Sequence, residues 1–311
     1  MSNNSDNNSN SIVKRLSEAK SVDELIKYLD ARRHNFYHHF TTFAKLEQVL
    51  LNANFRFTQD SGKNDMHEYK VKESPERRDK ILSVSLSWGD EDNMAMWAMY
   101  GIPWEDAVRI SMTGKAVKRW LKIIQKYVNE TDDADCAKLH DIVYYQGLIG
   151  EGPYTYWNKN NSLLLHNQRK GKIENEIFGE IVRPDKMTSY VKNSAWKQEQ
   201  ESRLSIFYKT NRSTFVDIPF GDDFSYVMNN TMITFGPWTP PQVVDEKRKR
   251  IRHIIDEQRN AINNQDEIII CDENILDLKS KLIGKCLIIS SSPFFDKIKL
   301  RKHCDFCGNN T

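Results

Sequence analysis

Residues 36–57 read FYHHFTTFAKLEQVLLNANFRF, and this stretch changes from a strand pattern to a helix pattern and back again. The aromatic run at residues 36–40 and the run at residues 55–57 are typical of strands. Between them, apolar side chains recur at helical spacing behind two threonines that can cap a helix; they are Phe43, Leu46, Val49 and Leu50 behind Thr41 and Thr42. The stretch therefore predicts a strand, a helix and a second strand, with His38 and His39 where the first strand ends.

Strand patterns outnumber helix patterns in the rest of the chain. Residues 81–87 (ILSVSLS) alternate strictly, as a half-buried strand does. Further strand patterns lie at residues 107–112, 176–183, 201–208, 231–235, 268–271 and 287–290. Helix patterns lie at residues 12–19, 21–29, 90–100, 114–128 and 241–263. Because the two kinds of pattern do not alternate regularly, the predicted class is α+β rather than a doubly wound parallel sheet.

Composition limits the classes of partner and location. The 311 residues carry 45 Lys and Arg against 43 Asp and Glu, a formal net charge of +2. This balance predicts no dedicated nucleic-acid or membrane surface, although a local basic patch stays open. No run approaches the about 18 consecutive apolar residues of a membrane helix, and the polar first residues do not resemble a signal peptide. We expect a disordered tail at residues 1–11, a single domain at 12–300, a C-terminal tail at 301–311 and a cytoplasmic location.

The C-terminal tail contains a CxxC motif formed by Cys304 and Cys307. A structural zinc site needs four ligands, and within this tail only His303 could add a third. We therefore expect no metal site and interpret the motif as an unpaired dithiol in a reducing compartment. Zinc binding by this tail stays open as the alternative.

Four segments in fixed order resemble the bacterial domain-of-unknown-function family 2971. They are YHHFTT at residues 37–42, SVSLS at 83–87 followed by MWAMYG at 96–101, WKQEQESR at 196–203, and ITFGP at 233–237. Members of that family read approximately YHYTS, then SFS followed by MWxxY, then WxxExEWR, then a strand ending in GP. The resemblance covers residues 36–298. This sequence departs from the pattern at two positions. Phe40 stands where the family has the tyrosine that follows its histidine, so the family histidine corresponds to His39. Ser202 stands where the family has tryptophan.

The opening of that pattern is similar to the NAD-binding strand of ADP-ribosyltransferases. The resemblance therefore implies an ADP-ribosyltransferase-like, mostly antiparallel sheet with flanking helices, and NAD as the substrate. It implies that Glu201 is the catalytic acid on the ribose, Glu199 the acid on the acceptor side, Arg203 the orienting cation and His39 the contact to the nicotinamide ribose. The remaining implied NAD contacts are Thr41, Ser85, Ser87, Trp97 and Tyr100, with Trp97 or Tyr100 as the aromatic wall of the pocket.

A carboxylate at this place fits the chemistry of breaking a glycosidic bond. The transition state carries positive charge at the anomeric carbon, and a fixed negative charge beside that carbon lowers the barrier. Residues i and i+2 of a strand share a face, so a strand through this segment would place Glu199, Glu201 and Arg203 side by side. We expect Glu201 and His39 to face one ribose.

Three functions from different classes remain open. The first is an NAD-consuming ADP-ribosyltransferase or NAD glycohydrolase, which the resemblance links to bacterial toxins and antiphage defence, with protein, nucleic acid or water as acceptor. The second is a nucleic-acid-binding or RNA-modifying module that uses the basic stretches at residues 167–172 and 247–253. The acids around residues 247–253 favour a salt-bridged solvent face there. The third is a catalytically silent interaction domain, and in each case the N-terminal helices could contact a partner protein.

Overall fold

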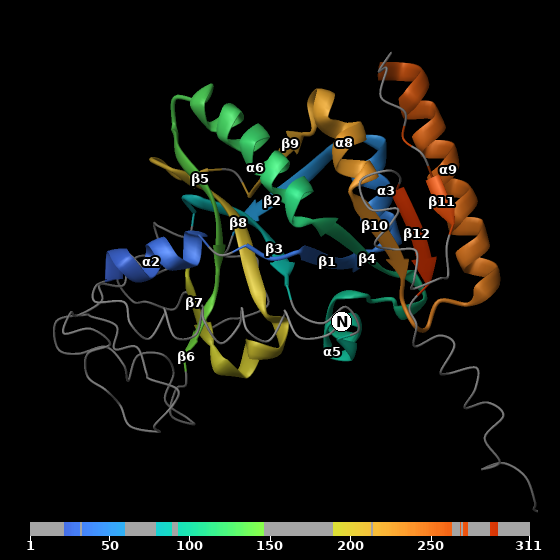
Figure 1. Ribbon diagram of the computed structural model, residues 1–311, viewed down its shortest axis with the longest axis horizontal. Helices are drawn as coiled ribbons and strands as arrows, with labels where there is room; N and C mark the ends of the chain where they lie inside the picture. Colours follow the sequence, from blue (N-terminus) through green and yellow to red (C-terminus); the bar gives the residue numbers. More distant parts are fainter. Residues whose placement is uncertain are drawn as a thin grey trace, which may run out of the picture. The chain divides into compact units, whose positions relative to one another are not determined.

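The computed structural model describes residues 22–31, 33–59, 79–88, 93–145, 189–212, 214–262, 268, 270–272 and 287–291 (Figure 1). The chain forms two compact units. Unit 1 comprises Met1–Arg33, Phe57–Ser85 and Gln125–Val216, and unit 2 comprises His34–Arg56, Leu86–Ile124 and Asp217–Thr311. The expectation of one domain over residues 12–300 stays a prediction.

Unit 2 is built on a mixed sheet in the strand order β11-β12-β10-β4-β1. Strand β1 (Phe36–Thr42) runs antiparallel to β4 (Ala107–Thr113) along its whole length, and β10 (Thr231–Phe235) runs antiparallel to β4 on the other side. Strands β12 (Leu287–Ser291) and β11 (Ile270–Asp272) extend the sheet in parallel. β4 is buried at all seven positions, because it lies between two neighbours.

Most helices of unit 2 are short, and the longest is α9. They are α3 (Phe43–Leu51), α5 (Met94–Tyr100), the first part of α6 (Gly114–Asn129), α8 (Phe224–Asn229) and α9 (Pro241–Ile262). Short 3-10 turns lie at η2 (Trp104–Asp106) and η5 (Gly221–Asp223). Helix α3 buries Phe43, Leu46 and Leu50, and it packs against α9.

Unit 1 contains a second group of strands, in the order β5-β8-β3-β2. Strand β5 (Ala134–Asp141) runs antiparallel to β8 (Glu201–Tyr208), and the unit 1 part of β2 (Asn54–Gln59) runs antiparallel to that of β3 (Ile81–Ser87). A separate parallel pair joins β6 (Val143–Tyr145) to β7 (Val191–Asn193), which leads into the 3-10 segment η4 (Ser194–Glu199). Helix α2 (Val22–Ala31) contacts β5, and β9 (Phe215–Pro219) begins in unit 1.

The mixed helix and strand content, with mostly antiparallel pairing, agrees with the predicted class. The strands predicted at residues 36–40, 55–57, 81–87, 107–112, 201–208 and 231–235 are all present, and so are the helices behind Thr42, Asn93 and Pro240. The sequence did not predict β5, β9 or α8. The predicted helix at 12–19 and strand at 176–183 lie outside the described residues. Among the helices of the described residues, none is long and apolar enough to cross a membrane.

Two glycines allow close packing around Ala107, at the start of β4. A Cβ atom on Gly101 would lie 2.4 Å from the Ala107 Cβ atom, and one on Gly236 would lie 2.6 Å from it. The Gly236 amide also donates to the Ala107 carbonyl at 2.8 Å. The glycine that ends MWAMYG and the glycine within ITFGP therefore have a packing role: they let α5 and β10 approach the same point of β4.

We predict that Gly236→Ala lowers the free energy of unfolding by about 1–3 kcal/mol, because the added methyl group overfills a packed site. Thermal and denaturant unfolding would measure the loss. The double variant Gly236→Ala/Ala107→Gly removes the opposing Cβ atom, and it should recover most of the stability. A double variant no more stable than Gly236→Ala would show that the loss does not come from this contact.

Candidate active site

The acidic segment at the start of β8 lies in a buried polar cluster of unit 1. Glu201, Arg203 and Ser205 alternate along β8, and side chains at alternate positions of a strand share one face. The register of β5 places His140 opposite Arg203, and β3 borders β8 on its other side. Three strands therefore supply polar groups around the predicted catalytic acid.

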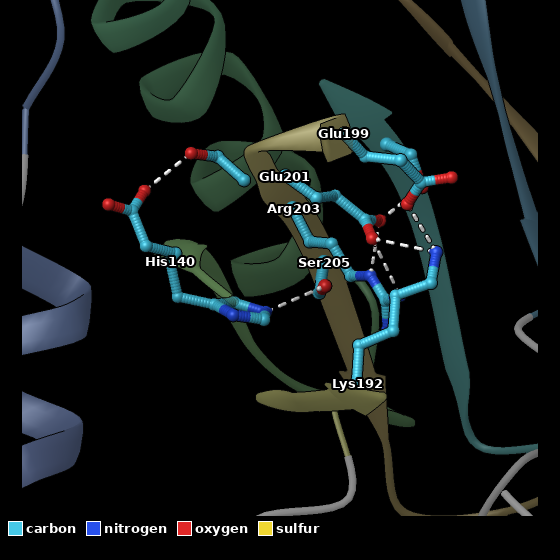
Figure 2. A network of polar contacts seen from close by, with 9 residues as sticks. His140, Lys192, Glu199, Glu201, Arg203 and Ser205 are labelled. Atoms are coloured by element: carbon cyan, nitrogen blue, oxygen red, sulfur yellow. Dashed lines mark hydrogen bonds and ion pairs between the residues drawn. The ribbon is translucent and has the colours of Figure 1, made fainter. Parts of the chain in front are cut away.

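The carboxylate of Glu201 accepts from three side chains (Figure 2). Ser85 Oγ donates to Oε1 at 2.6 Å, and Arg203 Nε donates to the same oxygen at 2.6 Å. On Oε2, Arg203 Nη2 donates at 3.1 Å and Lys192 Nζ at 3.2 Å. Hydrogen bonds from charged donors to a carboxylate are shorter and stronger than neutral ones, so these contacts hold the Glu201 side chain in a fixed orientation.

Glu199 belongs to the same cluster, but it does not lie on the strand that was expected to carry it. It ends the 3-10 segment η4, and Gln200 has a left-handed backbone with a φ of 44°. The expectation that Glu199, Glu201 and Arg203 are successive members of one strand face is therefore wrong, because the strand begins only at Glu201. Glu199 instead meets the cluster through Lys192, whose Nζ donates to Glu199 Oε2 at 2.5 Å.

Lys192 of β7 connects the two acids and was not identified from the sequence. Figure 2 shows its side chain reaching both carboxylates, and its Nζ also lies 5.0 Å from the centre of the Trp196 ring. Lys192 is 5% exposed, Glu199 2%, Glu201 3% and Arg203 0%. Two cations and two anions are thus buried together with no net charge, the condition under which buried charges are tolerated.

A second group of polar contacts in unit 1 involves β5, which pairs with β8. The rings of His140 and Tyr190 lie 4.1 Å apart between centres, and His140 Nε2 lies 3.1 Å from Ser205 Oγ. Tyr190 donates to Asp30 at 2.8 Å, and Lys138 donates to the same carboxylate at 3.1 Å. Burial, and then the charge of Asp30, raise the pKa of Tyr190, so its hydroxyl stays a donor at neutral pH.

The opposite face of β8 carries a polar contact at Ser202. Ser202, which stands where the resembled family has tryptophan, donates from its Oγ to Asp141 of β5. Both residues are buried. The departure from the family pattern at this position is therefore matched by a polar partner on the neighbouring strand, and it lies on the face away from Glu201.

Of the predicted site residues, the structure joins Glu199, Glu201, Arg203 and Ser85 by direct or Lys192-bridged contacts. The others belong to unit 2. His39 is half-buried, and its ring makes an edge-to-face contact with the ring of Phe55, with 5.1 Å between the ring centroids. Thr41 is buried on the same strand. Ser87, also buried, is the register partner of His38. Their part in an NAD site stays a prediction.

The two residues proposed as an aromatic wall lie in an apolar cluster of unit 2. Trp97 is fully buried, edge-on to Phe40 at 5.0 Å, and the Arg109 guanidinium lies 5.6 Å from the centre of a Trp97 ring. Tyr100 packs against the same cluster and is partly exposed. A ring enclosed on all sides cannot stack on a ligand, so Tyr100 is the better placed of the two.

A chain of polar contacts in unit 2 was also not identified from the sequence. His38 Nδ1 lies 2.9 Å from Ser111 Oγ, which accepts from Arg109 Nε at 3.0 Å. Arg109 Nη2 donates to Thr234 at 3.2 Å, and Thr234 lies 3.1 Å from Ser290 Oγ. The sequence placed His38 at a hydrophobic position. It is indeed buried, but its ring takes part in this polar chain.

The cations of the basic stretch on α9 are engaged by neighbouring acids. Lys247 is buried and pairs with Asp106 at 2.5 Å, and Arg250 pairs with Glu47 at 2.8 Å. His253 Nε2 lies 3.3 Å from a Glu257 carboxylate oxygen. These contacts support salt bridges along residues 247–253, but Lys247 is buried and does not lie on the predicted solvent face. The other basic stretch, residues 167–172, lies outside the described residues.

Within the described residues no group of three or more His, Cys, Asp and Glu side chains could hold a metal ion. Cys304 and Cys307 lie outside those residues, so the prediction about them stays untested.

No protein-family model matches the sequence, and no curated protein is significantly similar to it. Assignment to family 2971 therefore stays a prediction. Two solved structures of Thermus sp. 2.9 DarT are distantly similar. The complex with NAD+ has a TM-score of 0.32 and 7% identity, covering 85% of this chain and 98% of that one. The complex with ADP-ribosylated ssDNA has a TM-score of 0.30 and 8% identity, covering 72% of this chain and 92% of that one. At this level of similarity, the roles of residues in this chain are inferred from their own contacts.

We predict that Lys192→Met lowers the free energy of unfolding by about 3–5 kcal/mol, because it leaves a buried carboxylate without its cation. Denaturant unfolding monitored by circular dichroism would measure the loss. Lys197→Met in the exposed part of η4 is the matched control and should change stability by less than about 0.5 kcal/mol. Equal losses in the two variants would mean that Lys192 is not a structural counter-ion.

Proposed function

We propose that this chain breaks the bond between ribose and nicotinamide in NAD and transfers the ADP-ribose part to an acceptor or to water. The observation that carries the proposal is the Glu201 carboxylate, buried and oriented by Arg203 and Ser85. Support also comes from the resemblance of the segment around Glu201 to the Glu-x-Glu arrangement of ADP-ribosyltransferases.

The chemistry assigns separate tasks to the two residues of β8. As the glycosidic bond breaks, its electron pair leaves with the nicotinamide nitrogen, and positive charge develops on the ribose. Glu201 would face that charge and accept from a ribose hydroxyl, which both stabilises and orients the sugar. Arg203 contacts both carboxylate oxygens, so it fixes the orientation of Glu201 before the substrate arrives.

The reaction is completed by an acceptor hydroxyl or a water molecule, whose oxygen bonds to the anomeric carbon and whose proton passes to a base, either Glu199 or solvent. Glu199 is the residue that we propose on the acceptor side, because it lies in the same cluster and is connected to Glu201 through Lys192. The acceptor class is left open among protein, nucleic acid and water. A role as a bacterial toxin or antiphage effector belongs to the same proposal, since loss of NAD or modification of a macromolecule harms a cell.

Glu201→Gln keeps the size of the side chain but removes the charge that faces the developing cation. We expect turnover of NAD to fall by a factor on the order of 10²–10³. The affinity for NAD should change far less, because the lost interaction is stronger in the transition state than in the ground state. Nicotinamide release and calorimetric NAD binding would measure the two quantities.

Asp135→Asn, at an exposed position of β5, is the control and should leave both quantities unchanged. Acceptors to be tried are water, a protein mixture, single-stranded DNA and RNA. Wild-type protein that releases no nicotinamide with any of them would contradict the proposal and favour the interaction-domain alternative. Unchanged turnover in Glu201→Gln would remove Glu201 from the reaction.

A further inference from the structure

We propose that Lys192 competes with the substrate hydroxyl for Glu201, and that Glu199 is the positioning residue that draws Lys192 away. This inference rests on the proposed function. An ionised carboxylate has room for about four hydrogen bonds, two on each oxygen. Ser85 and Arg203 contribute two donors to Oε1, and Arg203 and Lys192 contribute two to Oε2. A ribose hydroxyl can therefore bind Glu201 only by replacing one of these donors.

The geometry points to Lys192 as the donor that gives way. Its contact to Oε2, at 3.2 Å, is the longest of the four. Arg203 is fully buried and holds both oxygens, so moving it would break two contacts. Ser85 is at 2.6 Å, the range of a strong hydrogen bond to a charged acceptor. Lys192 therefore loses less than either of the other donors.

Lys192 also has a second acceptor in place. Its Nζ lies 2.5 Å from Glu199 Oε2, a shorter distance than to Glu201. The Trp196 ring, 5.0 Å away, offers a further attraction to the cation. A small shift toward Glu199 keeps the ammonium group paired and opens one position on Glu201 Oε2. A hydroxyl that donates to Oε2 then replaces an ammonium that did the same.

This assignment gives Glu199 a task that precedes any contact with the acceptor. The left-handed backbone at Gln200 sets Glu199 off the line of β8, where it faces Lys192 instead of standing next to Glu201 on the strand. If Glu199 loses its charge, Lys192 is left with Glu201 as its carboxylate partner in the cluster. Lys192 would then bind Glu201 more firmly and exclude the substrate.

Two variants separate the competitor from the residue that restrains it. Glu199→Gln should raise the KM for NAD about tenfold, the effect expected for strengthening one charged hydrogen bond that the substrate must displace. The charge-balanced double variant Lys192→Met/Glu199→Gln lacks the competitor, so its KM should fall below that of the wild type. Calorimetric NAD binding should follow the same order, and thermal unfolding verifies that both variants are folded.

Lys197→Met is the matched control for removing a cation from this segment and should leave KM unchanged. Equal KM values for Glu199→Gln and the double variant would overturn the inference, because removing Lys192 would then have no effect on the substrate. Such a result leaves nicotinamide release by the wild type intact. By contrast, absence of nicotinamide release from both the wild type and the double variant would overturn the proposed function itself.

Discussion

Four ionised side chains buried in one place must neutralise one another, and this requirement shapes unit 1. Glu199, Glu201, Lys192 and Arg203 come from three successive segments, β7, η4 and β8, and each of the four is at most 5% exposed. An isolated charge in such an environment is far less stable than one in water, so removing one of the four leaves a buried charge without its counter-ion. The left-handed turn at Gln200 follows from this requirement, because it lets both acids reach one ammonium group. The arrangement that satisfies the charges also pre-orients the proposed catalytic carboxylate.

The sequence predicted the elements around this cluster better than the cluster itself. Strands such as β1, β3 and β8 show apolar or aromatic patterns of their own, and these patterns depend on local burial. The Glu-x-Glu-x-Arg spacing correctly identified Glu201 and Arg203 as neighbours on one face. It misplaced Glu199, because a single residue with positive φ breaks the two-residue period. The sequence around Lys192 shows no pattern that predicts its role. That role depends on the pairing of β7 with β6, and β7 is only three residues long, too short for a recognisable strand pattern.

Strand β5 shows why polar strands escape sequence analysis. Its residues ADCAKLHD lack the alternation of apolar and exposed positions, since the polar side chains of His140 and Asp141 are buried and hydrogen-bonded to serines of β8. The same reason applies to His38, whose buried ring is satisfied by Ser111 on the next strand. Period-based prediction assumes that buried means apolar. Where a sheet carries hydrogen-bonded polar side chains on a covered face, that assumption fails, and such faces are where chemistry needs its groups.

The complete enclosure of Arg203 has a consequence for the response of the site to its surroundings. Ions in solution weaken attractions between exposed charges over a Debye length of about 8–10 Å, but they cannot enter a packed interior. The surface pair between Arg250 and Glu47 on unit 2, with side chains 43% and 25% exposed, is open to that screening. Arg203 and Glu201, at 0% and 4%, are shielded from it. The orientation of the Glu201 carboxylate is therefore set by the fold rather than by the ionic strength of the medium. It persists at salt concentrations that weaken the ion pairs on the surface.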